Sequence, residues 1–245
     1  MTVIITLPVY KDSEFLRRAV ELLEEVTPSI TRDFTIVVAE DVSDSSRIVC
    51  ELTTKYPNIY YCQSDRRLGK GRALREVWKK IGGDVYVFMD VDLSTDLIMF
   101  GAYDNMIRKT GEYDLVIGSR YIQGSVVKRP WLRVFASLFY NLIVRSLFHT
   151  GVYDHQCGFK SLSRKAATLV LAGTKSNSWF LDTELIVLAL RRGLRVLEIP
   201  IFWVEKKNKK SVVEVINLVK DACIHMSDFA RFLRLALKTG VVQRN

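Results

Sequence analysis

Two acidic residues, Asp90 and Asp92, follow a run of apolar residues at 85–89. Such a run is typical of a buried strand, and strand side chains alternate with period two, so both carboxylates are expected on one side. Paired carboxylates at a buried strand end need a positive partner, and their oxygens suit Mg²⁺ or Mn²⁺. The pattern predicts a divalent cation between Asp90, Asp92 and a diphosphate. The alternative is a solvated turn that contains two aspartates by chance.

Strand-like and helix-like segments alternate through the first half of the chain. The expected strands are 3–7, 34–39, 59–62, 85–89 and 114–117, and the expected helices begin at Ser13 or span 47–56 and 72–81. This order predicts an α/β fold with a mostly parallel central sheet, in which ligands bind at the carboxyl ends of strands. Pro8, Glu40–Asp41 and Asp90–Asp92 follow three of these strands, so the residues predict a nucleotide-type site.

A basic loop with glycines, 66–71, precedes the helix expected at 72–81. Its glycine spacing fits neither a P-loop nor a dinucleotide-binding loop. Lys70 is expected either to lie near a phosphate or to belong to an ordinary surface turn.

The segment 131–148 is mostly apolar, with a polar stripe at Arg133, Ser137, Asn141 and Arg145. Arginines at these positions disfavour a membrane span, and they suit a helix that lies in the lipid headgroup region. A core helix with one wet edge is the alternative. The segment from Val212 onward predicts one or more further amphipathic helices, and the basic cluster 206–210 before it suits anions or a solvated loop.

Composition limits the class of protein. The 245 residues are 49% hydrophobic and carry a net charge of +9, which favours anionic partners such as phosphates, nucleic acid or an acidic membrane surface. The four cysteines stand far apart, without a CxxC pattern, which favours a reducing compartment and argues against structural zinc. We expect no signal peptide and no membrane-spanning helix.

Several short motifs then occur in the order seen in family 2 glycosyltransferases of GT-A fold, over about residues 1–212. They are Leu7–Asp12, Glu40–Ser43, Leu68–Gly71, Asp90–Asp92 and Gly118–Tyr121. The chain resembles dolichyl-phosphate mannose synthases in Gly118–Tyr121 and the helix after it. It is similar to dolichyl-phosphate glucosyltransferases in Gln156–Lys160 and Phe180–Leu185.

The resemblance implies a role for each matching position. The expected residues of the nucleotide-sugar site are Pro8, Tyr10, Asp12, Asp41, Lys70, Asp90, Asp92 and Lys206. The resemblance also implies Asp90 and Asp92 as metal ligands for Mg²⁺ or Mn²⁺, Arg120, Arg133 and Ser137 as the acceptor-phosphate site, and Asp92 and Arg120 as the catalytic residues. The chain departs from the family pattern at Asp12, Glu40, Ser94 and Val212, and these departures bear on the donor sugar and base.

The implied reaction transfers a hexose, with inversion, from a nucleotide diphosphate sugar to a polyprenyl phosphate. GDP-mannose is the preferred donor in this interpretation, and UDP-glucose is the alternative. The implied organisation is a catalytic domain over 1–211, with an interfacial helix at 131–148, followed by amphipathic helices over 212–245. The protein is expected in the cytoplasm, peripheral on the cytosolic membrane face, with a membrane-spanning partner subunit as a further hypothesis.

Two competing hypotheses remain from the residues. A family 2 transferase acting on a sugar hydroxyl would need a general base, with Asp182 or Glu184 as candidates. A non-enzymatic binder of nucleotides or nucleic acid would use the basic surface, but basic and aromatic residues are not interleaved as in such binders. We therefore expect no nucleic acid partner.

Overall fold

The computed structural model describes residues 1–42, 45–206 and 212–238, without the side chains of 212–222 and 237–238. Its centre is a sheet of order β3-β2-β1-β4-β7-β5-β8, in which only β7 runs antiparallel to its neighbours. The strands are β1 Val3–Val9, β2 Phe34–Asp41, β3 Ile59–Ser64, β4 Val85–Met89, β5 Leu115–Ser119, β7 Phe159–Ser163 and β8 Val196–Pro200. The predicted mostly parallel α/β architecture is confirmed.

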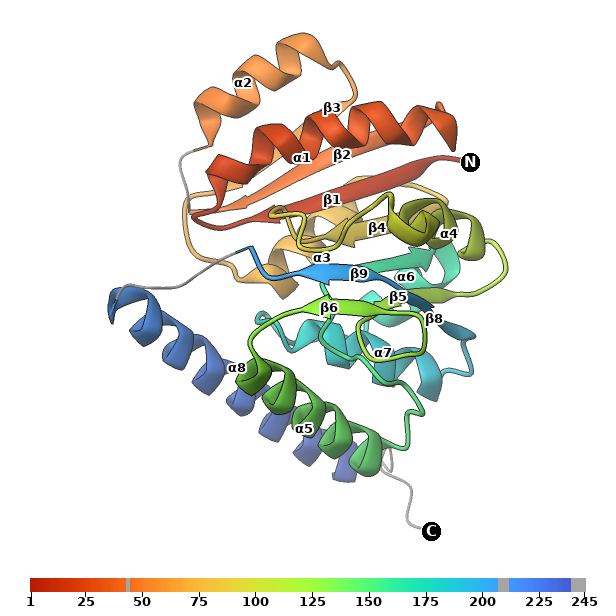
Figure 1. The fold of residues 1–245 in the computed structure, drawn as a ribbon, viewed down its shortest axis with the longest axis vertical. Coiled ribbons are helices and arrows are strands. Elements are labelled where there is room, and N and C mark those ends of the chain that lie inside the picture. Colours follow the sequence, from red (N-terminus) through yellow and green to blue (C-terminus); the bar gives the residue numbers. More distant parts are fainter. Residues whose placement is uncertain (43–44, 207–211, 239–245) are drawn as a thin grey trace.

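Helices cover both faces of this sheet (Figure 1). On one face, α1 (Ser13–Val26), α2 (Ser46–Lys55) and α4 (Ala102–Lys109) share a buried apolar core with the strands. On the other face, α3 (Lys70–Lys80), α6 (Arg164–Leu171) and α7 (Leu181–Arg191) form a second core. Short 3₁₀ turns occupy Thr27–Ser29 and Met99–Gly101. Apolar residues spaced for a helix face the sheet in each case, as the amphipathic patterns predict.

The first strand was expected to stop before Pro8, but β1 continues through it to Val9. Proline lacks the amide hydrogen that a central strand donates to its neighbour. Here β4 pairs only with Val3–Thr6, whereas pairing with β2 extends to Val9. Pro8 therefore lies where one side of β1 has no strand neighbour.

Residues 196–204 form two strands. β8 ends at Pro200 and forms an edge of the large sheet, whereas β9 (Phe202–Val204) pairs in parallel with β6 (Val126–Lys128) in a separate small sheet. The chain thereby leaves the large sheet and carries residues 203–206 across to the pocket described below.

Two long helices lie side by side at one end of the molecule (Figure 1). They are α5 (Trp131–Phe148), which begins and ends where the sequence predicts, and α8 (Val212–Lys238), which is one continuous helix. Aromatic residues join them to α7: Phe148, Phe180 and Phe229 are buried and lie ring to ring at 5.8–6.1 Å. Most of the basic cluster, residues 207–210, lies outside the described residues.

Candidate functional site

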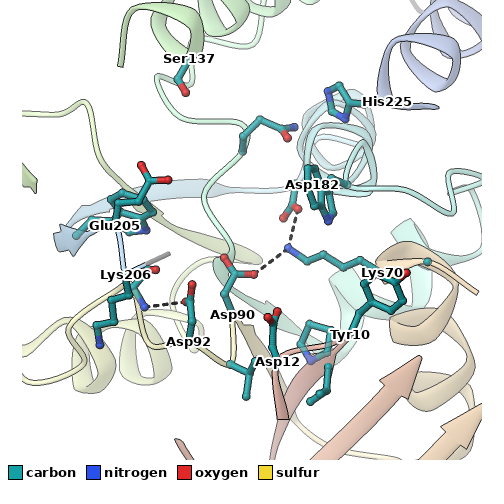
Figure 2. A pocket seen from close by; sticks show the side chains of 18 of the residues that line it. Tyr10, Asp12, Lys70, Asp90, Asp92, Ser137, Asp182, Glu205, Lys206 and His225 are labelled. Carbon is teal, nitrogen blue, oxygen red and sulfur yellow. Dashed lines mark hydrogen bonds and ion pairs between the residues drawn. The ribbon is translucent and has the colours of Figure 1, made fainter. Parts of the chain in front are cut away.

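A pocket of about 610 Å³ opens at the carboxyl ends of β1, β2 and β4 and extends to α5 and α8. All the site residues expected from the sequence line it: Pro8, Tyr10, Asp12, Asp41, Lys70, Asp90, Asp92, Arg120, Arg133, Ser137 and Lys206. Figure 2 shows carboxylates and amines from distant parts of the chain gathered in this pocket. The structure brings the predicted residues together, while their individual roles stay predictions.

Asp90 and Asp92 reach the pocket through a turn. β4 ends at Met89, and the amide of Leu93 donates to the carbonyl of Asp90 at 3.2 Å. Leu93 has a φ of 52°, and the amide of Ser94 donates to the Asp92 carboxylate at 3.0 Å. Strand alternation is therefore the wrong reason for the two side chains being together. The turn brings both to the pocket, and the side chain of Asp90 is 49% exposed there.

Gly158 preserves the space that the Asp90 carboxylate occupies. A Cβ atom at Gly158 would lie 2.0–2.4 Å from the carboxylate atoms of Asp90, and the Gly158 carbonyl accepts from the Asp90 amide at 3.1 Å. Among the described residues no group of three or more His, Cys, Asp or Glu side chains forms a complete metal site. Two carboxylates instead fit Mg²⁺ or Mn²⁺ if a substrate diphosphate were to provide the other oxygens.

The end of the pocket nearest β1 and β2 combines an aromatic ring with a cation. The Arg67 guanidinium lies 4.3 Å from the centre of the Tyr10 ring, and both residues line the pocket. Asp41 accepts from the amides of Leu68 at 2.6 Å and Gly69 at 2.7 Å. Asp41 thus fixes the basic loop against the end of β2 while lining the pocket.

The glycines of that loop permit a close backbone contact. Gly69 has a φ of +80°, and a Cβ there would lie 2.2 Å from the Asn177 carbonyl oxygen. A Cβ at Gly71 would lie 2.4 Å from the Ser176 carbonyl oxygen. The glycines therefore allow the start of α3, with Lys70, to lie against the segment before α7.

Lys70 belongs to a buried charge network around Asp182. The Asp182 carboxylate accepts from Lys70 Nζ at 2.9 Å and from Lys160 Nζ at 2.8 Å, and Lys70 also lies 3.6 Å from Asp90 (Figure 2). Burial lowers the pKa of Lys70, but Asp182 and Asp90 outweigh this effect and raise it above its usual value. Lys70 is therefore a permanent cation beside Asp90, where a diphosphate would carry negative charge.

The two candidate general bases are both occupied. Burial raises the pKa of Asp182, but Lys160 and Lys70 together hold it below its usual value, so its carboxylate is a weak base. Glu184 accepts from the amides of Lys175 and Ser176 at 2.9–3.0 Å and does not line the pocket. Asp182 lines the pocket but is paired with two lysines, and Glu184 lies outside the pocket, so both are poor candidates for activating a hydroxyl acceptor.

Arg120 is buried and already paired. Its Nε and one Nη donate to the Asp154 carboxylate at 2.7 and 2.8 Å, and the Arg120 amide donates to the same carboxylate at 3.0 Å. Burial lowers the pKa of Arg120, but Asp154 more than offsets this and raises it. Arg120 lines the pocket as a fixed charge with its own counterion, and an acceptor phosphate would meet it only beside Asp154.

A second cationic group lies between α5 and β9. Arg133 pairs with Glu205, Arg129 Nε lies 3.2 Å from the same carboxylate, and Arg129 donates to Ser137 Oγ at 2.8 Å. Burial, and then repulsion from Arg120, lowers the pKa of Arg129. The expected pair Arg133 and Ser137 is therefore joined through Arg129, which sequence reasoning missed.

Other lining residues were also missed, among them Gln156, Trp179, Trp203, Glu205, His225 and Met226. Glu205 stands next to Lys206, and Arg129 stands two residues before the expected helix, so proximity to predicted residues was their only signal. Nothing in the sequence pattern of α8 points His225 toward the pocket, because that depends on how α8 lies against α5 and α7.

His155 and Cys157 are both fully buried. The His155 ring bonds to Thr150 Oγ1 and Asn141 Oδ1, each at 2.9 Å. Burial, followed by repulsion from Lys160, lowers the pKa of His155 to about 3, and burial raises the pKa of Cys157 to about 12.

Several known proteins with similar sequences are named as sugar transferases. The chain is 36% identical to Glycosyltransferase AglD of Haloferax volcanii over 89% of this chain and 34% of AglD. It is 30% identical to Dolichyl-phosphate beta-glucosyltransferase ALG5A of Trichomonas vaginalis over 82% of this chain and 65% of that protein. Polyprenol monophosphomannose synthase of Mycolicibacterium smegmatis is 29% identical over 53% of this chain and 49% of its own. The chain thus spans about a third of AglD and under two thirds of ALG5A.

Solved structures share the fold at low sequence identity. Glucosyl-3-phosphoglycerate synthase from Mycobacterium tuberculosis, in complex with Mn²⁺, UDP and glucosyl-3-phosphoglycerate, has a TM-score of 0.66 at 14% identity, over 95% of this chain and 79% of its own. The mannosyltransferase PcManGT from Pyrobaculum calidifontis, in complex with GDP-Man and Mn²⁺, has a TM-score of 0.61 at 16% identity, over 94% of this chain and 64% of its own. The fold is that of GT-A glycosyltransferases. The family model "Glycosyl transferase family 2" matches residues 4–169, and the chain therefore belongs to that family and is a glycosyltransferase.

Proposed function

We propose that the protein transfers a hexose, with inversion, from a nucleotide diphosphate sugar to a polyprenyl phosphate at a membrane surface. The observation that carries this proposal is the layout of the pocket. Asp90 and Asp92 lie near the strand ends, and the Arg129, Arg133 and Ser137 cluster lies beside α5. The first pair suits a metal-bound diphosphate and the second suits a phosphate.

The acceptor chemistry follows from the occupied bases. A phosphate oxygen is anionic near neutral pH, so it attacks the anomeric carbon without losing a proton to the protein. The bond between the anomeric carbon and the diphosphate breaks, and the diphosphate leaves with the electron pair. A divalent cation held by Asp90 and Asp92 would supply charge neutralisation for the leaving group. Lys70, 3.6 Å from Asp90, adds a fixed positive charge there.

The donor is best described as a nucleotide-activated glucose. The preference for GDP-mannose drawn from the sequence is not confirmed, and the glucose alternative fits better, because several similar proteins are named dolichyl-phosphate beta-glucosyltransferases. UDP-glucose is therefore the first donor to test, with GDP-mannose beside it.

The exposed face of α5 supports the lipid acceptor. Trp131, Leu132, Phe135, Phe139 and Leu142 are 58–74% exposed on this helix, while Arg133 and Ser137 turn to the pocket. By length and composition alone α5 qualifies as a membrane span, with 17% of it buried. Its arginines and its contacts with the pocket favour a helix that lies in the headgroup region, with its apolar face toward the acyl chains.

The test is transfer of labelled sugar into a product extractable with organic solvent. We expect label from UDP-glucose with dolichyl phosphate and Mg²⁺ or Mn²⁺, and none after chelation of the metal. Transfer to dolichol or a sugar hydroxyl, but not to dolichyl phosphate, would contradict the proposal.

Phe135 tests the membrane part of the proposal. Phe135→Ser should weaken binding to phospholipid vesicles about tenfold or more, since burying a phenylalanine side chain contributes about 1.5–3 kcal/mol. Its melting temperature should change little because the side chain is 69% exposed. Tyr60→Ser, at an exposed residue of the distant strand β3, is the control. Equal vesicle binding by both variants would contradict surface docking through α5.

A further inference from the structure

Glu205 occupies the position in which the arginines of the second cationic group would hold an anion. Its amide donates to the Lys128 carbonyl at 3.0 Å, which fixes the backbone beside Arg129. One carboxylate oxygen lies 3.2 Å from Arg129 Nε, and the other contacts Arg133. A carboxylate that bridges two guanidinium groups has the oxygen arrangement of a bound phosphate.

The local charges give this carboxylate a clear electrostatic function. The positive charge of Arg120 repels that of Arg129, but Asp154 neutralises Arg120. Glu205 is the carboxylate that balances Arg129 and Arg133 among the described contacts. The side chains of Glu205 and Arg129 are 13% and 17% exposed, so water screens their interaction only partly.

We propose that Glu205 is a resident anion that the acceptor phosphate must displace, and that this competition selects phosphate monoesters over phosphate diesters. The inference rests on the proposed function. A monoester carries about −1.5 to −2 charges near neutral pH, whereas a diester carries a single charge, like the carboxylate. The monoester therefore gains more from two arginines than the carboxylate does, and the diester does not.

The environment of the pocket makes this selection useful. The arginines lie beside the exposed apolar face of α5, where a docked enzyme would meet many phospholipid headgroups, which are phosphate diesters. Arginines without a counterion would bind these headgroups and obstruct the acceptor. With Glu205 in place, a diester replaces one monoanion by another and pays the cost of its own desolvation.

Soluble probes test the inference without a membrane. Methyl phosphate and dimethyl phosphate are titrated into the full chain, and binding is followed by calorimetry. The wild type should bind methyl phosphate at least about tenfold more tightly than dimethyl phosphate. In Glu205→Gln, which keeps the size of the side chain, binding of dimethyl phosphate should tighten about tenfold and the preference should shrink, as expected for one lost charge in a partly desolvated pair.

Glu51→Gln is the matched control. Glu51 also pairs with two arginines, Arg17 of α1 and Arg47 of its own helix α2, but it does not line the pocket. This variant should keep the wild-type preference. In the lipid assay, Glu205→Gln should also lower the KM for dolichyl phosphate and make the reaction sensitive to added dimethyl phosphate.

Three results would overturn the inference. They are equal wild-type affinity for the two probes, weaker binding of both in Glu205→Gln, which would mean that Glu205 orients the arginines, and no change in that variant. The wild-type ratio needs no substitution, and Glu205→Ala repeats the test with a second variant. If the predicted probe binding is seen but no sugar is transferred to dolichyl phosphate, the proposed function fails and the anion competition stands.

Discussion

Asp182 and the pair Asp90 and Asp92 line the same pocket but differ in burial and in their charged partners. Asp182 is 2% exposed and carries two lysines of the protein's own, Lys70 and Lys160. Asp90 is 49% exposed, lies 3.6 Å from Lys70, and stands beside Asp92. Lysines of the protein enclose the first carboxylate, whereas the second pair lines an open pocket that a ligand can enter.

The difference separates structural charge from functional charge. A buried carboxylate with two buried ammonium partners is expensive to disturb, because removing one charge leaves the other unpaired. A half-exposed carboxylate pair contributes little to folding and keeps its oxygens available to a cation. Substitutions at the two sites should therefore affect different measurements.

Asp92→Asn should have the largest effect, on turnover. If the proposed metal site is correct, removing one of its two carboxylates should lower the transfer rate by about 10³-fold, comparable to the loss of a main electrostatic element of an active site. The melting temperature should stay near that of the wild type, since the described contact of its carboxylate is one amide at 3.0 Å. Asp104→Asn, in an exposed pair with Arg108, is the control. Full activity in Asp92→Asn would contradict the proposed role of Asp92 in catalysis.

Asp182→Asn should instead mainly affect stability. It leaves the fully buried Lys160 without its carboxylate, so we expect a loss of about 3 kcal/mol in the free energy of unfolding, measured with urea. The described carbonyl partners of Lys160, in His155 and Cys157, keep the loss from being larger. Unchanged unfolding in this variant would show that the network is not a structural element.

The dependence of stability on pH should distinguish the buried neutral His155 from the buried charged carboxylates. The folded His155 has a pKa of about 3 against 6.5 for an ordinary histidine, so between these values the unfolded chain binds the extra proton. Stability should therefore fall by about 2 kcal/mol from pH 8 to pH 5 on account of His155. The half-buried His225, whose pKa is also lowered mainly by burial, adds to the slope.

The carboxylates lose their contribution in a lower range. The pKa values of Asp154 and Asp182 are held below the usual value despite burial, so their stabilisation is present above about pH 4 and is lost as the pH falls through the lowered values. Urea unfolding at a series of pH values measures both ranges. A flat profile from pH 8 to pH 5 would contradict the neutral state of His155.

Gly158→Ala should have the smallest effect of the series. The new methyl group would lie 2.0–2.4 Å from the Asp90 carboxylate atoms. The half-exposed side chain of Asp90 would therefore turn away from Gly158. We expect a loss of about tenfold in turnover, with a raised metal requirement, because misplacing a ligand weakens binding about 10-fold or more. Gly82→Ala, where a Cβ would meet nothing within 4 Å, is the control. Equal activity of Gly158→Ala and Gly82→Ala would contradict the proposed role of Asp90 as a metal ligand.

Sequence reasoning found the half of the site that strand ends create. Carboxyl ends of parallel strands meet at one edge of a sheet, so Pro8, Asp41 and Asp90 could be placed together from local patterns alone. The turn at Asp90 and the continuation of β1 through Pro8 could not, because both depend on which neighbouring strand ends first.

Long-range pairing hid the other half. Lys70 and Asp182 are 112 positions apart, and Arg129 and Glu205 are 76 positions apart. No local pattern connects such residues. Their contacts depend on β7 joining the large sheet antiparallel to its neighbours and on β9 lying in a separate sheet with β6. The polar stripe of α5 was visible in the sequence, but which part of its apolar surface is exposed depends on α8.

The strand order has a consequence for the order in which the chain folds. β3, β2, β1 and β4 are neighbours and are the first four strands to be synthesised, so this part of the sheet can form while the ribosome is still adding the rest. β5 has to wait, because the later strand β7 lies between it and β4. Pairing across such sequence separations is slow. The nucleotide end of the pocket should therefore be complete first, and the nascent protein should gain affinity for a nucleotide before it can accept a phosphate.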